Sequence, residues 1–185
     1  RSHGWSRNKI FYKKFKNRYK DLDENFLFIN SGYNLRPTEI QAAIGHNQFK
    51  RINYFKKIRT ANRNKIIDYL KKLKDWDNQF EFIQNPNSIN PSWFGLPILL
   101  NKKFIKKKKK FLNFLKKIGI ENRPIISGNF MNQPSSNLYK LKKKIKLTNA
   151  DEIEKRGFFI GLHTKKISNQ ALRNLCENLL KIEKL

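Results

Sequence analysis

Residues 32–45 read GYNLRPTEIQAAIG, and the rest of the chain is interpreted outward from this stretch. Pro37 fixes φ near its helical value and lacks the N–H that a helix start leaves unpaired, so a helix is predicted to begin here. Thr38 is a candidate N-cap, and Glu39 places an anion at the positive end of the helix dipole. The next residues form one apolar stripe at i, i+3, i+4 spacing. They are Ile40, Ala43 and Ile44.

Two polar residues, Asn34 and Arg36, precede this helix. A loop that leads into a helix N-terminus is a place where hydrogen-bond donors converge on an anion such as a phosphate. The same spacing also fits an asparagine that caps a turn and an arginine that is simply solvated. From the spacing alone we favour the second interpretation and keep phosphate binding as the alternative.

The stretch resembles the GYN-x-R-x-T-x-x-QAAIG signature of the DegT/DnrJ/EryC1/StrS family of nucleotide-sugar aminotransferases and dehydratases. Further segments resemble the same family in the same order, and together they cover nearly the whole chain. They are RSHGW (1–5), SWFGLPI (92–98), ENRPIISGNFMNQP (121–134) and LTNADEIEKRGFFIGLH (147–163). The resemblance implies pyridoxal or pyridoxamine 5'-phosphate as cofactor and a nucleotide-linked keto sugar as substrate.

The resemblance also implies a fold class. This is α/β with an α+β C-terminal lobe: the end of the large domain and the small C-terminal domain of a fold type I pyridoxal-phosphate enzyme. We assign residues 1–75 to the end of the large cofactor-binding domain with its long linking helix. Residues 76–185 are assigned to the small α+β domain, three strands with helices on one face.

The residue pattern predicts the helices and strands of both parts of the chain. Helix is expected from Pro37 to about Leu73 with a break at Gly45, and residues 76–91 are expected to be a turn-rich connector. The predicted strands are 94–100, 120–126 and 158–162. The predicted helices are 103–118 ended by Gly119, 149–156 with Asn149 as a possible cap, and 168–184 with Ser168 as N-cap.

Composition limits the classes of function. The formal net charge of +27 would ordinarily suggest a polyanion partner, but lysine is spread from end to end, so we expect no nucleic-acid binding. Lys106–Lys110 is interpreted as the solvated face of an amphipathic helix. The one cysteine, Cys176, excludes an internal disulfide and a four-cysteine cluster and is expected in the core. We expect no metal site, no membrane span and a cytoplasmic protein.

The candidate site residues come from the resemblance. It implies that Asn34 and Arg36 bind the cofactor of a neighbouring subunit, which makes the protein a homodimer with shared active sites. The implied substrate-binding residues are His3, Arg7, Arg123, Asn129 and His163. The cofactor-anchoring residue is expected outside this chain, so we assign no catalytic residue within it.

The sequence leaves the function open between two subfamilies and one other class of protein. Aminotransferases anchor the cofactor on lysine, whereas the 3-dehydratases that act on nucleotide-linked 4-keto-6-deoxy sugars have histidine there. The motifs SHGW, RPIISGNF and GFFIGLH look closer to the dehydratases, which points to deoxysugar and lipopolysaccharide O-antigen biosynthesis. The alternatives are an aminotransferase that makes an amino sugar and a non-catalytic basic module that binds polyanions.

Overall fold

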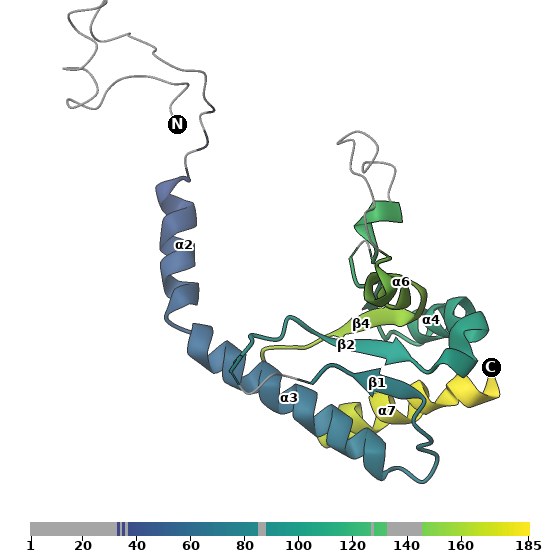
Figure 1. The fold of residues 1–185 in the computed structure, drawn as a ribbon. Coiled ribbons are helices and arrows are strands. Elements are labelled where there is room, and N and C mark those ends of the chain that lie inside the picture. The colour runs from purple at the N-terminus through teal and green to yellow at the C-terminus, as the bar shows by residue number, and fades with distance from the viewer. Residues whose placement is uncertain (1–32, 34, 36, 85–87, 127, 133–145) are drawn as a thin grey trace, which may run out of the picture. The chain divides into compact units, whose positions relative to one another are not determined.

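The computed structural model describes residues 33, 35, 37–84, 88–126, 128–132 and 146–185. The chain divides into two units, Arg1–Lys50 and Arg51–Leu185, and each is described by itself. Figure 1 shows their elements along the chain. In the described part of the chain, no helix combines the length and the apolar character needed to cross a membrane.

Helix α2 (Glu39–Phe49) is the described element of the first unit. Thr38 caps it as predicted: Thr38 Oγ1 accepts a hydrogen bond from Gln41 N at 3.3 Å, and Gln41 Oε1 accepts one from Thr38 N at 2.9 Å. This capping box pairs two backbone donors at the helix start. Every residue of α2 is exposed. The apolar stripe is therefore present without a packing partner among the described residues.

Helix α3 (Ile52–Lys72) follows, and the predicted break at Gly45 is wrong. Gly45 lies inside α2, and the helix is interrupted instead at Lys50 and Arg51. A single glycine costs a helix interior about 1 kcal/mol, which is too little to end a helix with a good cap. Arg51 has φ −99° and ψ −1°, outside ideal helix geometry. The helix ends at Lys72, as predicted.

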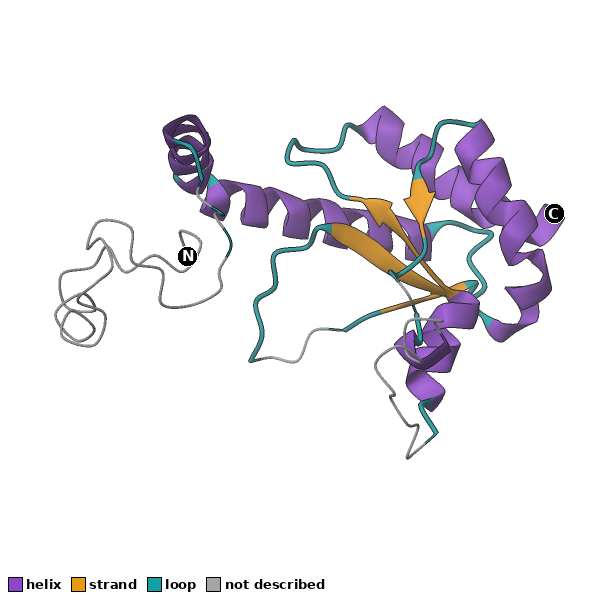
Figure 2. Cartoon of the chain, turned by 90° about the horizontal axis from the view of Figure 1, so that it is seen from above, coloured by secondary structure: helices purple, strands orange, loops and turns teal. Residues whose placement is uncertain are grey.

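Four strands form one antiparallel sheet in the order β1-β2-β4-β3. They are β1 (Phe80–Phe82), β2 (Gly95–Leu100), β3 (Asn122–Arg123) and β4 (Gly157–Gly161). The three predicted strands exist, although β3 is shorter than expected. Strand β1 lies in the segment predicted as a connector, so that prediction is wrong there. Figure 2 shows the strands in orange with the helices around them.

The core lies between one face of this sheet and helices α3, α4 (Lys108–Lys117) and α7 (Asn169–Leu180). Alternate residues of β2 point into it because side chains of a strand alternate between faces. Figure 1 shows α3 and α7 side by side below the strands. Fully buried core residues include Leu70, Leu96, Ile98, Leu100, Phe111, Leu115, Phe158, Cys176 and Leu179.

Helix α6 (Thr148–Arg156) covers the other face of the sheet, so helices lie on both faces and not on one as predicted. Arg156 Nη1 bonds Glu81 Oε1 at 2.7 Å and Leu100 O at 2.8 Å. Glu81 points away from the core side of β1, where Phe80 and Phe82 lie. A buried guanidinium with these partners fixes the end of α6 against the sheet.

The predicted helix ends were right in part. Ser168 caps α7 by accepting a hydrogen bond from Ala171 N at 3.2 Å, and Gly119 takes a positive φ of 83° after α4. Asn149 does not cap α6. The helix starts one residue earlier, at Thr148, and its N-cap position is Leu147, which makes no side-chain cap bond.

The lysine run does more than face the solvent. It spans η3 (Lys102–Lys107) and the start of α4. Lys107 Nζ donates to Glu183 O at 2.8 Å, Lys108 Nζ to Glu154 O at 3.0 Å and Lys110 Nζ to Leu185 O at 2.8 Å. These carbonyls lie at the C-terminal ends of η5 (Lys181–Lys184) and α6, where backbone acceptors lack helical partners. Lys106 and Lys109 are exposed as expected.

The predicted domain boundary near residue 75 stays a prediction. Helix α3, which precedes that boundary, contributes Ile66, Ile67 and Leu70 to the core shared with the sheet and α7. In its contacts α3 therefore belongs with the second unit.

Candidate functional site

The structure describes three of the seven sequence-predicted site residues: Arg123, Asn129 and His163. The other four lie outside the described residues, and their assignments stay predictions. They are His3, Arg7, Asn34 and Arg36.

Arg123 lies on β3, opposite Phe159 of β4, with an exposed side chain. Its Nε and Nη2 both donate to Glu121 Oε1, at 3.0 and 2.7 Å. Exposed ion pairs contribute roughly 0 to 1 kcal/mol, so little free energy holds this guanidinium on Glu121. Arg123 is thus exposed and weakly paired, and its role in substrate binding stays a prediction.

Asn129 is buried, with 1% of its surface exposed. Its Nδ2 donates to Asp151 Oδ1 at 2.6 Å, its backbone N donates to Glu154 Oε2 at 3.1 Å, and its Oδ1 accepts from Met131 N at 3.1 Å. Asn132 Nδ2 also donates to Glu154 Oε2, at 2.9 Å. The side chain of Asn129 thus holds its own loop on α6, and direct contact with a substrate stays a prediction.

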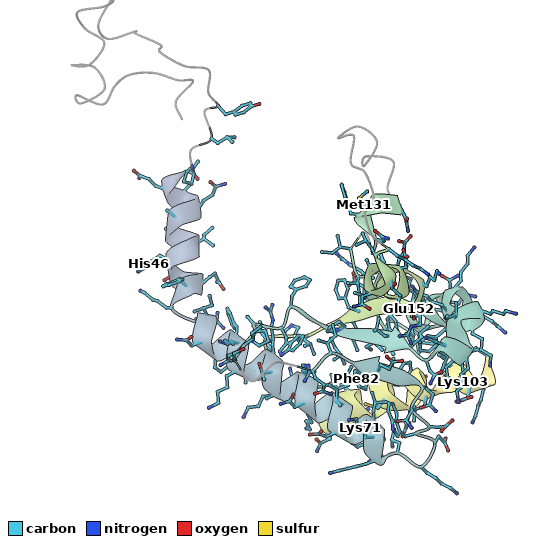
Figure 3. All side chains as sticks on the ribbon, in the orientation of Figure 1. His46, Lys71, Phe82, Lys103, Met131 and Glu152 are labelled. Carbon is cyan, nitrogen blue, oxygen red and sulfur yellow. The ribbon has the colours of Figure 1, made fainter. Side chains whose placement is uncertain are left out.

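Gly128 lets this loop approach α6. Its φ is +61°, and a Cβ at this position would lie 2.5 Å from Glu154 Cβ, so both conformation and space exclude a larger residue. Two residues earlier, Ile126 has φ +43°, which is rare for a β-branched residue. Figure 3 labels Met131 of the loop and Glu152 of α6, the helix that the loop contacts.

His163 lies in the loop after β4, with an exposed side chain. Its Nδ1 accepts a hydrogen bond from Lys165 N at 2.9 Å, so the neutral ring carries its proton on Nε2. The hydrogen bond fixes the ring's orientation and leaves Nε2 as a donor.

Asn62 of α3, which the sequence analysis did not single out, holds the loop of His163. Its Nδ2 donates to His163 O at 3.1 Å and to Lys165 O at 2.8 Å, and its Oδ1 accepts from Ile167 N at 3.0 Å. Asn62 is buried and lies between Ile58 and Ile66 on one helix face. An asparagine at a core position of an apolar stripe was the signal that could have identified it.

The described candidates do not form one site. Arg123 pairs with Phe159 in the sheet, whereas His163 lies in the loop beyond Gly161, the last residue of β4. Asn129, bound to α6, lies at the Arg123 end of the sheet. The structure therefore brings Arg123 and Asn129 to one end of the β3–β4 pair and His163 to the other.

The SWFGLPI segment meets α3 through cation–aromatic contacts. The Arg63 guanidinium lies 4.5 Å from the ring centre of Trp93, and that of Arg59 lies 5.9 Å from the ring centre of Phe94. Arg63 Nη2 also donates to Ile83 O, and desolvation by burial lowers the pKa of Arg63. These contacts tie the start of β2 to α3.

The N-terminus of α2 is the described part of the predicted cofactor site. A helix N-terminus favours a phosphate, but the capping box occupies the N–H groups of Thr38 and Gln41, and Glu39 adds a negative charge. A cofactor phosphate beside this helix would therefore depend on the side chains of Asn34 and Arg36. Their residue types fit that role, since both carry N–H donors.

Curated proteins similar to this chain include two GDP-4-keto-6-deoxy-D-mannose 3-dehydratases. The protein from Yersinia pseudotuberculosis is 32% identical over 185 residues, which cover 98% of this chain and 45% of that protein. The protein from Escherichia coli O55:H7 is 32% identical over 166 residues, which cover 88% of this chain and 41% of that protein. The chain thus spans less than half the length of these relatives.

A solved structure of the E. coli GDP-4-keto-6-deoxy-D-mannose-3-dehydratase with bound hydrated PLP is also similar. It matches 97% of this chain and 45% of its own, with a TM-score of 0.77 and 28% sequence identity. The likeness confirms the predicted fold class, the C-terminal part of a fold type I enzyme with its α+β lobe. The model of the DegT/DnrJ/EryC1/StrS aminotransferase family matches residues 1–180. The chain therefore belongs to the DegT/DnrJ/EryC1/StrS aminotransferase family.

Proposed function

We propose that the chain forms the C-terminal part of a 3-dehydratase that uses pyridoxal or pyridoxamine phosphate and acts on nucleotide-linked 4-keto-6-deoxy sugars. The observation that carries the proposal is the 32% identity to a GDP-4-keto-6-deoxy-D-mannose 3-dehydratase over 98% of this chain. The proposed pathway is deoxysugar formation for a lipopolysaccharide O-antigen. A similar Salmonella typhimurium protein, named lipopolysaccharide biosynthesis protein RfbH, supports that setting.

The proposed cofactor follows from the same relatives. When bound, it supplies the electron sink for elimination at the sugar. In this chain Asn34 and Arg36 would hold its phosphate, and no catalytic residue is assigned to residues 1–185. Their position before helix α2, whose own N–H donors are partly occupied, supports a side-chain role.

The proposed substrate is a nucleoside diphosphate sugar. A solved 3-dehydratase variant that is 28% identical to this chain was determined with bound GDP-perosamine. His3 and Arg7 are proposed to contact the sugar across a homodimer interface, and Arg123 to contact its phosphates. The exposed and weakly paired guanidinium of Arg123 supports the last assignment. A cytoplasmic location completes the proposal.

An aminotransferase is the second candidate, because solved aminotransferases share the fold. Their identities to this chain of 21% and 16% show the fold alone. The higher identity to the 3-dehydratases favours the first candidate.

The test uses the complete protein that carries this chain. It is incubated with pyridoxal phosphate, glutamate and GDP-4-keto-6-deoxy-D-mannose, and the sugar products are identified by mass spectrometry. The proposal expects a 3-deoxy sugar nucleotide. A stable 4-amino sugar and no 3-deoxy product would establish the aminotransferase instead, and the absence of both products would reject the proposed substrate.

The shared active site is tested with Asn34→Ala in the same protein. This variant is expected to weaken cofactor retention by about 1–3 kcal/mol, the usual loss when a buried phosphate acceptor lacks a donor. Mixing it with a variant of the upstream cofactor-anchoring residue should restore one of the two sites in each mixed dimer. Ile44→Ala on the same helix is the matched control, since no cofactor role is proposed for Ile44. Mixtures without restored activity would place Asn34 in its own subunit's site or in none.

A further inference from the structure

We infer that Asp151 and Glu154 are positioning residues, which hold the loop Gly128–Asn132 on α6 in the conformation that receives the nucleotide sugar. We call this segment the clamped loop. The inference rests on the proposed function, because it names two residues that act on the substrate site through another segment.

The clamped loop is bound at several points by the two carboxylates. Asp151 Oδ1 accepts from Asn129 Nδ2 at 2.6 Å. Glu154 Oε2 accepts from the backbone N of Asn129 at 3.1 Å and from Asn132 Nδ2 at 2.9 Å. Gly128 packs directly against Glu154, where no Cβ fits. One turn of α6 therefore fixes both the start and the end of the loop.

The hydrogen bond between Asn129 and Asp151 has a fixed direction. Asn129 Oδ1 already accepts from Met131 N within the loop, so its amide side faces Asp151 as a donor. A carboxylate offers two acceptor oxygens, whereas an amide at position 151 keeps one acceptor oxygen and replaces the other with an NH2 donor. Asp151 thus serves Asn129 as a hydrogen-bond acceptor.

Two apolar side chains in and next to the clamped loop are exposed, which is unusual for a loop that serves packing alone. Phe130 is 45% exposed within the clamped loop, and Ile126, just before it, is 87% exposed at φ +43°. A β-branched residue in this region costs about 1–3 kcal/mol. These exposed side chains, beside a backbone that hydrogen bonds fix, are where the inference places the ligand.

The exposed groups of this segment match the chemistry of a nucleotide sugar. An aromatic ring such as that of Phe130 offers a stacking face to a base or an apolar face to a sugar. The Arg123 guanidinium, on the strand that leads into the segment, offers paired donors to a phosphate. These groups fit the nucleoside diphosphate sugar of the proposed function.

The experiment measures steady-state kinetics on GDP-4-keto-6-deoxy-D-mannose and GDP binding by calorimetry, both with the complete protein. Asp151→Asn is expected to raise KM and the GDP Kd by roughly tenfold, with kcat within about twofold, since the cofactor site is not touched. The matched control is Glu177→Gln, an exposed carboxylate on α7, which should leave both constants unchanged.

A reciprocal variant separates positioning from stability. Asn129→Asp combined with Asp151→Asn restores one donor and one acceptor in reversed order, and it should recover most of the lost affinity. Phe130→Ala changes an exposed side chain, so it should fold normally and still raise KM. Thermal unfolding of all variants accompanies the kinetics.

Clear results overturn the inference. Unchanged KM and GDP affinity in Asp151→Asn and Phe130→Ala would do so. Asp151 is a structural residue only if the melting temperature falls, substrate and GDP affinity are lost equally in all variants, and the reciprocal variant recovers none of that affinity. If the unaltered protein neither binds GDP nor converts the sugar nucleotide, the proposed function fails as well, and this outcome is recognised before any variant is made.

Discussion

Helices α2 and α7 both have apolar residues at i, i+4 spacing. Those of α2 are exposed, whereas those of α7 are buried. In α2, Ile40 and Ile44 are 73% and 59% exposed. In α7, Leu172 and Cys176 are 3% and 0% exposed and pack in the core with α3. An i, i+4 pattern thus predicts which face of a helix is apolar, but the presence of a second apolar surface decides whether that face is buried.

The largest expected difference between the two helices is in thiol reactivity. Burial raises the pKa of Cys176 to about 12, so its thiol stays neutral and inaccessible near pH 8. In residues 1–185 alone, Cys176 should react through unfolding only, whereas the added thiol of Ile40→Cys should react as a free exposed one. For a stability near 5 kcal/mol the two rates differ by a factor of about 1,000 or more. Labelling with a thiol reagent measures both phases in one sample.

The labelling result can contradict the comparison directly. If the labelling rates of Cys176 and of the thiol at position 40 agree within tenfold, α7 opens as readily as α2. The unaltered protein, which contains Cys176 as its one cysteine, is the control for the slow phase.

The second prediction concerns stability of the core beneath α3. Ile66 is 2% exposed and packs in the core. Ile66→Ala should lower the free energy of unfolding by about 2–5 kcal/mol, because transfer and cavity costs add. Urea denaturation followed by circular dichroism measures it. A loss below 1 kcal/mol would mean that the lobe repacks freely around this position.

A smaller effect is expected at the ion pair between β1 and α6. The hydrogen bond from Arg156 lowers the pKa of Glu81, with a further Coulombic contribution from Arg156. A depressed carboxyl pKa stabilises the fold above the unfolded pKa, about 4.3 for glutamate, and this stabilisation is lost as the pH falls through the folded pKa. Because the Glu81 side chain is 56% exposed, the contribution is under about 1 kcal/mol.

Unfolding free energies measured between pH 7 and pH 3 test this contribution. The decline with falling pH should be shallower in Glu81→Gln than in the unaltered protein. The matched control is Glu121→Gln, which removes a carboxylate from an exposed pair with Arg123. Parallel curves for Glu81→Gln and the unaltered protein would show that the pair adds nothing to acid stability.

The smallest effect is expected on α2. Ile44→Ala removes an exposed side chain, and such substitutions usually change stability by no more than about 0.5 kcal/mol. The urea experiment used for Ile66→Ala measures it. A loss near that of Ile66→Ala would reveal a buried environment for α2 in solution and would remove the contrast with α7.

Local signals in the sequence predicted the fold well where a few neighbouring residues decide the structure. The caps at Thr38 and Ser168 and the stop at Gly119 are of this kind, because each depends on atoms within three or four residues. The break assigned to Gly45 failed because a glycine's small helix cost does not by itself end a helix. Strand β1 was missed because its pairing partner β2 determines it.

The candidate site was harder to predict because its residues depend on distant partners. Asn129 was identified by resemblance, yet its partners Asp151 and Glu154 lie 22 and 25 residues further along the chain. Asn62 bonds residues 101 to 105 positions away. No pattern within one segment shows such pairing, because it arises only when loops pack on α6 and α3 in the folded chain.

The contact of Asn62 with the loop before α7 has a consequence for synthesis of the protein. Helix α3 and the loop that it binds are about 100 residues apart in the chain. At a ribosomal rate of about 5–20 residues per second, α3 is synthesised roughly 5–20 s before α7. During that interval the nascent chain exposes apolar surface that α7 later covers, which makes this half of the lobe a binding site for cellular chaperones.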